Sequence, residues 1–414
     1  MSRACALAAL TLWEDTGRFA EHILDELAKK FRLSGPDRGL AQEILYGSIR
    51  HLRLLDEVID GLRSGKIKSD TRNLLRIGLF QLLRSGIAEH AAIHETVSLA
   101  RPHEKKLVNA ILRRAQRERA EIEAAIATWS LAERTSHPDF LVKRWESQHG
   151  PDATAFLCDW NNQVPPVFAR INAYAADPEG LNRVRSETIP CLIGPDFPDF
   201  FRVEGALPLD WIEAGLVYVQ DPSTSLACRL LDPQPGEIVL DACAAPGGKT
   251  ALLAALRGSP EGLIASDSAA PRLEQLRRNL NRLGLAAVAT HQIDWTSPES
   301  TAAAKLPLCD AILLDAPCSN TGVMRRRVDV RWHLSEREIR RQAEAQAALL
   351  AGVQSVLKPG GRIVYSTCSI DSVENEDLVA ASGLPLVRSV TSRPWVDGYD
   401  GAYAALLHAD EAFT

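Results

Sequence analysis

The stretch that decides the fold of the second half of the chain is Ile238-Val239-Leu240-Asp241-Ala242-Cys243-Ala244-Ala245-Pro246-Gly247-Gly248-Lys249-Thr250. Its short apolar run predicts a strand, and its small residues and glycines allow the following turn to pass close to a ligand. A phosphate-binding P-loop would need Gly where position 243 is Cys, and the spacing of a dinucleotide-binding loop is also absent. The turn is therefore better suited to a nucleoside with an amino-acid tail than to a phosphate.

Apolar runs and helical stretches alternate along the chain from Gly236 onward. The runs are Ile238–Leu240, Leu263–Ser266, Val288–Ile293, Ala311–Leu314 and Arg362–Tyr365. The helical stretches between them are Thr250–Arg257, Ala270–Leu283 and Glu336–Leu357. This alternation predicts an α/β fold with a parallel, doubly wound sheet, and such sheets bind ligands at the carboxyl ends of their strands.

Polar residues and cysteines follow these predicted strands. Asp267 lies where a carboxylate can take both ribose hydroxyls of a nucleoside, although it could instead cap the next helix. Asp294 is interpreted as an adenine contact, with turn formation as the alternative. Asp315 and Cys318 follow the fourth run and Cys368 the fifth, so the cysteines would meet beside the ligand if these strands are neighbours. A lone cysteine is more often a small buried hydrophobe, so the pairing carries this argument.

The rest of the chain divides by its composition. Residues 1–135 predict an all-helical bundle, in which the period from Leu40 to Leu62 indicates one helix that starts at Ser34-Gly35-Pro36-Asp37. Residues 136–235 are interrupted by prolines and predict a small mixed α/β connecting subdomain. Residues 236–414 hold the alternating strands and helices and predict a separate domain.

The composition is that of a soluble globular protein, because 46% of the 414 residues are apolar and no apolar run is long enough to span a membrane. The first residues predict an amphipathic helix rather than a signal peptide, so we expect a cytoplasmic protein with no membrane partner. The eight cysteines show no metal-binding spacing, and we expect neither a metal nor a disulfide framework. The net charge of −6 disfavours nucleic acid, but basic residues cluster at Arg101–Arg119 and Arg325–Arg331.

Three strings, in this order, resemble the RsmB/Sun/nucleolar-protein family of RNA cytosine-5 methyltransferases: DACAAPGGKT from Asp241, LLDAPCSNTGVMRRRVDVRW from Leu313, and YSTCSI from Tyr365. The start of the chain, with Leu45-Tyr46-Gly47 among the shared segments, is similar to the NusB-type helical domain. This pairing is typical of the bacterial RsmB branch, which modifies small-subunit (16S) ribosomal RNA, and the resemblance covers nearly the whole chain. One departure is Val328-Asp329, where the family often has Pro before the Asp.

The resemblance implies a NusB-like RNA-binding domain followed by a Rossmann-like class I catalytic domain that uses S-adenosylmethionine. It implies that Cys368 is the nucleophile that attacks cytosine, that Cys318 assists release of the product, and that Asp315 lies beside the base or the donor methyl group. The residues alone do not decide which cysteine attacks. The implied cofactor-binding residues are Cys243, Ala244, Ala245, Pro246, Gly247, Gly248, Lys249, Asp267, Asp294 and Asp315.

The expected partner is RNA, and the protein is expected to act as a monomer. The target base must leave its stack to enter a pocket, and basic side chains hold the RNA backbone. We assign RNA contact to Arg113, Arg114, Arg117, Arg170, Arg325 and Arg326. Two alternatives stay open: the same chemistry on transfer RNA, and a non-catalytic NusB-like RNA-binding protein.

Overall fold

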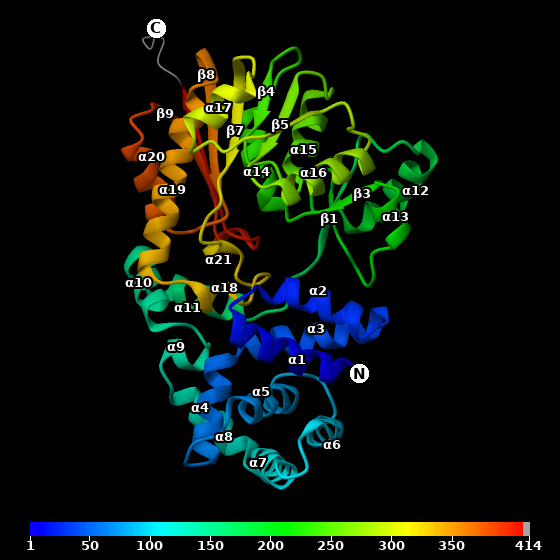
Figure 1. Ribbon diagram of the computed structural model, residues 1–414, viewed down its shortest axis with the longest axis vertical. Helices are drawn as coiled ribbons and strands as arrows, with labels where there is room; N and C mark the ends of the chain where they lie inside the picture. The colour runs from blue at the N-terminus through cyan, green and yellow to red at the C-terminus, as the bar shows by residue number, and fades with distance from the viewer. Residues whose placement is uncertain (409–414) are drawn as a thin grey trace. The chain divides into compact units, whose positions relative to one another are not determined.

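The computed structural model describes residues 1–408 and forms two compact units, whose elements are labelled in Figure 1. The first unit comprises Met1–Val164 together with the separate segment Met324–Leu334. The second unit comprises Pro165–Val323 and the chain from Ser335 onward. The domain boundaries predicted after residues 135 and 235 divide the chain differently and stay a prediction. No helix in the described part of the chain is both long and apolar enough to cross a membrane.

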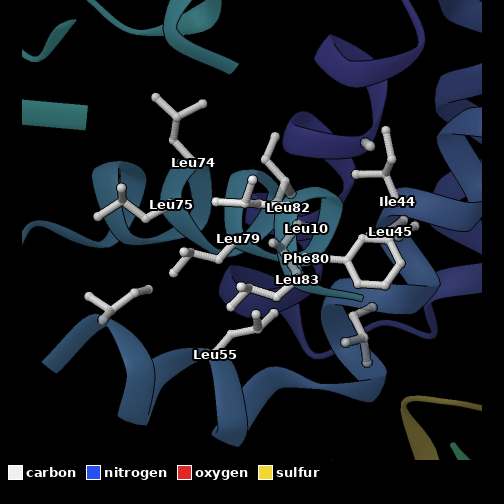
Figure 2. Packing of buried hydrophobic residues seen from close by; sticks show 14 of the residues in the cluster. Leu10, Ile44, Leu45, Leu55, Leu74, Leu75, Leu79, Phe80, Leu82 and Leu83 are labelled. Carbon is white, nitrogen blue, oxygen red and sulfur yellow. The ribbon is translucent and has the colours of Figure 1, made fainter. Parts of the chain in front are cut away.

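The first unit is built of helices, as the sequence predicts. They are α1 (Ser2–Thr16), α2 (Ala20–Lys30), α3 (Gly35–Arg50), α4 (Leu52–Leu62), α5 (Ser69–Leu83), α6 (Glu89–Leu99), α7 (Lys105–Arg117), α8 (Arg119–Thr128), α9 (Leu131–Arg134), α10 (Asp139–His149), α11 (Pro151–Asn161) and α18 (Val330–His333). Helix α5 buries every residue from Asn73 to Leu83, and Figure 2 shows its side chains among Leu10 and Leu55. Helices α3 and α5 approach closely at Gly47, where an added Cβ would lie 1.9 Å from the ring of Phe80.

The single helix predicted up to Leu62 is wrong in one respect, because the structure breaks it at His51 into α3 and α4. Ser34 caps the start of α3, as predicted. At His51 the backbone leaves helical geometry, and the hydroxyl of Ser136 accepts a hydrogen bond from the backbone nitrogen of Arg53 at 2.9 Å. Because the group that satisfies this helix start comes from a distant part of the chain, the hydrophobic period alone could not reveal the break.

A three-stranded antiparallel sheet in the order β2-β1-β3 begins the second unit. Its elements are β1 (Phe168–Ile171), α12 (Pro178–Thr188), β2 (Phe200–Arg202), α13 (Leu209–Glu213) and β3 (Val217–Val219). The side chains of Ala169, Phe201 and Trp211 form part of its own small core. Strands of three or four residues are too short to display a clear alternation, so the sequence predicted only a mixed region here.

A seven-stranded sheet in the order β6-β5-β4-β7-β8-β10-β9 dominates the second unit. Its strands are β4 (Val239–Asp241), β5 (Leu263–Asp267), β6 (Ala289–Gln292), β7 (Cys309–Asp315), β8 (Leu357–Thr367), β9 (Leu386–Ser392) and β10 (Ala402–His408). Strands β4 to β8 are parallel, whereas β10 pairs antiparallel with β8 and β9 pairs antiparallel with β10. All five predicted strands are present, which confirms the parallel core of the sheet; β9 and β10 were not among the predicted runs.

Helices cover both faces of this sheet, as Figure 1 shows. The helices of this part of the second unit are α14 (Ser225–Leu231), α15 (Gly248–Arg257), α16 (Ala270–Arg282), α17 (Pro298–Ala304), α19 (Glu336–Gln354) and α20 (Glu376–Ala381), and the short helix α21 (Pro394–Asp397) lies between β9 and β10 in the chain. Val239 and Leu313 pack in one core with residues of α14, α15 and α16, whereas their neighbours Leu240 and Ile312 pack in a second core with Leu350 of α19. Burial on both faces explains why the parallel strands are almost uniformly apolar in the sequence.

Candidate active site

Three parallel strands end in a carboxylate at the same edge of the sheet. Strands β4, β5 and β7 end at Asp241, Asp267 and Asp315. Asp241 is fully buried, its Oδ2 accepts a hydrogen bond from the hydroxyl of Thr250 at 2.7 Å, and burial raises its pKa to about 7. The carboxyl edge of a parallel sheet is the usual place for a ligand, so these strand ends define the candidate site.

The loop between β4 and α15 runs so close to its surroundings that two of its positions require glycine. A Cβ on Gly248 would lie 2.5 Å from the ring of Tyr218. A Cβ on Gly247, which has a φ of +105°, would lie 2.9 Å from a methyl group of Leu276. The small residues of this loop are therefore needed for its packing within the unit as well as for the approach of a ligand.

The two aspartates that follow β5 and β6 differ in how their oxygens are used. Asp267 is 3% exposed, and its Oδ1 accepts a hydrogen bond from the backbone of Ala269. Its Oδ2 lies 3.2 Å from the guanidinium of Arg272 but has no hydrogen-bond partner among the described residues. Asp294 is exposed, and its Oδ1 accepts hydrogen bonds from the backbone and the hydroxyl of Thr296. Asp267 thus keeps an acceptor for a ligand, while Asp294 helps to form a turn.

The structure brings the two predicted cysteines together. Strands β7 and β8 are parallel neighbours, and the Sγ atoms of Cys318 and Cys368 are 3.2 Å apart. The Oδ1 atom of Asn320 accepts a hydrogen bond from Cys368 Sγ at 3.2 Å. The hydrogen bond with Cys368, together with burial and the charge of Glu374, raises the pKa of Cys318 well above its ordinary value. Cys318 is therefore a protonated thiol at neutral pH, in contact with a second sulfur.

Asp315 is held from two sides next to a small cavity. Lys249 Nζ lies 2.7 Å from Asp315 Oδ2, and the hydroxyl of Ser366 donates to Asp315 Oδ1 at 3.3 Å. Burial opposes the charge of Lys249, but Asp315 outweighs this effect and raises the lysine pKa. All three residues and Cys368 line a cavity of about 40 Å³, whose described lining does not include Cys318. Cys368 is thus the thiol that reaches the cavity together with a carboxylate.

Known families match along most of the chain. The family described as 16S rRNA methyltransferase RsmB/F matches residues 228–384, the NusB family matches residues 1–117, and the ferredoxin-like domain of RsmF/B-like methyltransferases matches residues 137–210. The ribosomal RNA small subunit methyltransferase B of Klebsiella pneumoniae subsp. pneumoniae is 35% identical over 98% of this chain and 97% of its own length. This chain belongs to the RsmB family of methyltransferases. The resemblance found in the three sequence strings is thereby confirmed.

Solved structures share the fold of this RsmB-family chain. The crystal structure of PH0851 has a TM-score of 0.76 at 23% identity and covers 98% of both chains. A methyltransferase homolog protein from Pyrococcus horikoshii has a TM-score of 0.57 at 27% identity and covers 67% of this chain and 97% of its own. The predicted fold class, a NusB-like helical bundle and a Rossmann-like methyltransferase domain, is confirmed.

Two arginines of the RsmB-family chain are not at the surface, where RNA contact was expected. Arg170 is 1% exposed and donates to the side chain of Gln220 and, at 3.3 Å, to the carbonyl of Gly248 at the start of α15. Arg325 is 2% exposed, and its guanidinium lies 3.7 Å from the centre of the Trp160 ring. Both guanidinium groups have partners inside the protein, so the structure does not place them at the surface, and contact of these two arginines with RNA stays an untested prediction.

The other predicted RNA-binding arginines keep some exposure. Helix α7 buries its apolar stripe and leaves Arg114 and Arg117 exposed and Arg113 partly exposed. Arg114 pairs with Glu118 at 2.9 Å, which occupies part of its guanidinium. Arg326 is partly exposed. Contact of these four arginines with RNA stays a prediction.

Sequence reasoning missed the polar residues that support the two cysteines. Asn320, which has a φ of +58°, joins both loops: its Nδ2 donates to the carbonyl of Cys318 at 2.8 Å, and its Oδ1 accepts from Cys368. Glu374 and Asn375 are buried and bond to the same two loops. The available signal was the position of Glu374-Asn375 shortly after the YSTCSI string, which ends at Ile370.

Proposed function

We propose that this protein transfers a methyl group from S-adenosylmethionine to carbon 5 of a cytidine in small-subunit ribosomal RNA, through a covalent cysteine–cytosine intermediate. The observation that carries the proposal is the 3.2 Å separation between the sulfurs of Cys318 and Cys368 at the carboxyl edge of the sheet. The substrate class is supported by the names of the relatives, which are ribosomal RNA small subunit methyltransferases B. The NusB-type region supports an RNA partner, and we propose a monomer that acts in the cytoplasm.

The residues at this edge fit S-adenosylmethionine, which supplies an electrophilic methyl group on a sulfonium. The buried Oδ2 of Asp267 lacks a hydrogen-bond partner in the described chain, and Asp267 is the last residue of β5, where a carboxylate can take ribose hydroxyls. Gly247 and Gly248 keep the neighbouring loop free of side chains. The residues that we assign to the cofactor are Cys243, Ala244, Ala245, Pro246, Gly247, Gly248, Lys249, Asp267, Asp294 and Asp315.

Carbon 5 of cytosine is too weak a nucleophile to take a methyl group from a sulfonium without activation. A Cys368 thiolate that adds to carbon 6 forms a carbon–sulfur bond and moves an electron pair to carbon 5, which can then attack the methyl group. The position of Cys368 in the lining of the cavity supports its assignment as the attacking thiol. Asp315, held by Lys249, is assigned to the ring nitrogen and amine of the base, where it would stabilise the intermediate.

Release of the product requires the carbon-5 proton to leave and the carbon–sulfur bond to break. A base, either Asp315 or a water molecule, takes the carbon-5 proton, the electron pair of the carbon–hydrogen bond forms the new double bond, and Cys368 departs as a thiolate. We assign Cys318 to this step, since its raised pKa keeps it protonated and its sulfur lies 3.2 Å from that of Cys368. A protonated thiol at that distance can donate a hydrogen bond to the departing sulfur and so stabilise its negative charge.

The two cysteine variants test the chemistry in opposite directions. Cys318→Ala should accumulate a covalent protein–RNA adduct that survives a denaturing gel, because attack proceeds and release fails. Cys368→Ala should form no adduct and lose methyl transfer. Cys191→Ala, a partly exposed cysteine of the second unit outside the site, is the matched control and should behave like the unmodified protein. Adduct formation by Cys368→Ala, and none by Cys318→Ala, would reverse the assignment of the two thiols.

The substrate is tested in cells that lack the gene. Mass spectrometry of nucleosides from small-subunit ribosomal RNA should show the loss of one 5-methylcytidine, restored by the intact gene and not by the Cys368→Ala variant. An unchanged small-subunit RNA would overturn the assigned substrate. A loss from transfer RNA would favour the same chemistry on that RNA, and no loss from either would favour a non-catalytic RNA-binding protein.

A further inference from the structure

A buried carboxylate lies behind the Cys318 loop. Glu374 is 0% exposed and ends the short helical turn Ser372–Glu374 that follows β8. Its Oε1 accepts a hydrogen bond from the backbone nitrogen of Ser319 at 2.8 Å, and its Oε2 accepts one from the hydroxyl of the same residue. Ser319 directly follows Cys318 in the chain, so Glu374 fixes one side of the backbone that carries this thiol.

A side chain of helix α19 completes this support. The Nε2 atom of Gln346 donates to the carbonyl of Pro317 at 2.8 Å and to Oε1 of Glu374 at 2.9 Å. Pro317 directly precedes Cys318. The hydroxyl of Tyr365 donates to Gln346 at 3.0 Å and to the backbone carbonyl of Glu374 at 2.7 Å, which fixes the pair in turn. The residues before and after Cys318 are therefore held by one buried network.

The next residue along the chain supports the other thiol. Asn375 is 2% exposed, and its Nδ2 donates to the carbonyl of Ser369 at 3.0 Å. Its Oδ1 accepts a hydrogen bond from the hydroxyl of Thr367 at 2.6 Å. Thr367 and Ser369 are the residues on either side of Cys368. Two consecutive buried side chains therefore each hold the backbone of one cysteine loop, and Asn320 joins the two loops.

We infer that Glu374 and Asn375 are positioning residues with different tasks: Glu374, together with Gln346, holds Cys318 for release of the product, whereas Asn375 holds Cys368 for the attack on cytosine. The inference rests on the proposed two-thiol function. None of the three side chains lines the cavity, so they act through the backbone next to each thiol. A buried carboxylate is costly unless it is fully hydrogen-bonded, and these bonds end on the residues that flank the cysteines.

The division of tasks predicts that the two positions affect different steps. In Glu374→Ala the backbone nitrogen of Ser319 loses its acceptor, and in Gln346→Ala the carbonyl of Pro317 loses its donor. In both variants release of the product should slow by roughly ten- to hundredfold, while the attack on cytosine is little changed. Covalent adduct should then accumulate, as in Cys318→Ala. Asn375→Ala should slow adduct formation by a similar factor and should accumulate none. Glu374→Gln keeps an acceptor for Ser319 and should restore most of the release rate.

The experiment uses the full chain, S-adenosylmethionine and deproteinised small-subunit ribosomal RNA from cells that lack the gene. Adduct formation and decay are followed over time on denaturing gels, next to methyl transfer in a single turnover. Asp377→Ala removes an exposed acid from α20, the short helix that begins directly after Asn375, and is the matched control that should change neither rate. If Glu374→Ala does not fold, Gln346→Ala and Glu374→Gln still separate the two rates.

The outcomes distinguish this inference from the proposed function. If Cys318→Ala forms no adduct, the two-thiol function fails and this inference fails with it. If Cys318→Ala accumulates adduct but Gln346→Ala and Glu374→Ala do not, only the assignment of Glu374 and Gln346 is overturned. If Asn375→Ala and Glu374→Ala slow both steps equally, both side chains serve the stability of the site, and the division of tasks is wrong.

Discussion

The Cys318 loop and the segment Met324–Leu334 lie a few residues apart in the chain, yet the sequence predicts the position of Cys318 much better than that of the arginines in this segment. Cys318 follows a parallel strand, and the topology of the sheet places it next to Cys368, as the sequence predicts. Arg325 follows seven residues later, in a segment that belongs to the first unit, and its side chain is buried. A side chain at a strand end has its place set by the sheet, whereas an arginine-rich segment has no period that shows whether it faces solvent.

The arginine-rich segment is part of the core of the first unit. Arg331 is fully buried, and its guanidinium donates to the carbonyls of Ser136 and Asn161 and to the side chain of Asn162 at 3.0–3.2 Å. Burial and the charge of Arg50 lower the pKa of Arg331 to about 9. The guanidinium of Arg331 thus supplies hydrogen-bond donors to oxygens of the surrounding residues and so stabilises the first unit.

The same segment also caps a helix. Asp329 Oδ2 accepts a hydrogen bond from the backbone nitrogen of Ala20, the first residue of α2, at 2.6 Å. The indole of Trp332 donates to the carbonyl of Ile49 near the end of α3 at 2.9 Å. An acid at a helix start both supplies a missing acceptor and interacts favourably with the helix dipole. The string VDVRW therefore contributes to stability through contacts that link it to distant residues.

The largest effect is expected from Arg331→Met. The methionine fills much of the space but donates no hydrogen bonds, so four oxygens lose a partner, and the free energy of unfolding of the first unit should fall by about 2–4 kcal/mol. Urea denaturation followed by circular dichroism would measure this loss. Arg327→Met, the same change at an exposed position of the segment, should stay within roughly 0.5 kcal/mol of the unmodified protein. Equal losses in both variants would remove the distinction between buried and exposed arginines in this segment.

A smaller effect is expected for the two aspartates that the sequence assigns to binding of the cofactor, Asp267 and Asp294. Asp267→Asn replaces a buried carboxylate that has an unused acceptor, and it should weaken the binding of S-adenosylmethionine by about ten- to hundredfold, since hydrogen bonds to a charged group are lost. Asp294→Asn keeps an oxygen for the turn with Thr296 and should change the affinity by less than about threefold. Isothermal titration calorimetry gives both constants. A larger loss of affinity in Asp294→Asn than in Asp267→Asn would favour the adenine contact as the main role of Asp294 and would contradict the ribose contact assigned to Asp267.

Much of the fold and the site could be predicted because local sequence dictated them. The runs that form β4, β5 and β7 are mostly apolar since both faces of these strands are buried, and each ends in an aspartate that marks the carboxyl edge. The edge strand β9 was missed, because its residues from Leu386 to Arg388 are exposed and show no alternation. An exposed edge strand lacks the pattern that burial imposes.

The parts that escaped prediction depend on partners distant in the chain. The break at His51 is stabilised by Ser136, and the burial of Arg331 depends on carbonyls from three separate places. Glu374 is an ordinary surface residue type, and only the folded chain shows that its carboxylate holds the backbone beside Cys318. Helix and strand propensities and the hydrophobic period depend on residues that are close in the sequence. Hydrogen bonds between polar groups that are distant in the sequence therefore cannot be predicted from them.

The smallest effect is expected for the arginines of α7, which are exposed or partly exposed, in contrast to the buried Arg325 and Arg331. Each phosphate contact that is lost should lower the slope of log affinity against log salt by about 0.7 and weaken RNA binding by roughly threefold at moderate salt. We expect this for Arg113→Gln and Arg117→Gln, and a weaker effect for Arg114→Gln, whose guanidinium is already paired with Glu118. Lys305→Gln, an exposed cation of the second unit, is the control. Fluorescence anisotropy with labelled ribosomal RNA across a salt series measures the slopes. Equal slopes in all four variants would mean that the exposure of an arginine on α7 does not identify it as a residue that contacts RNA.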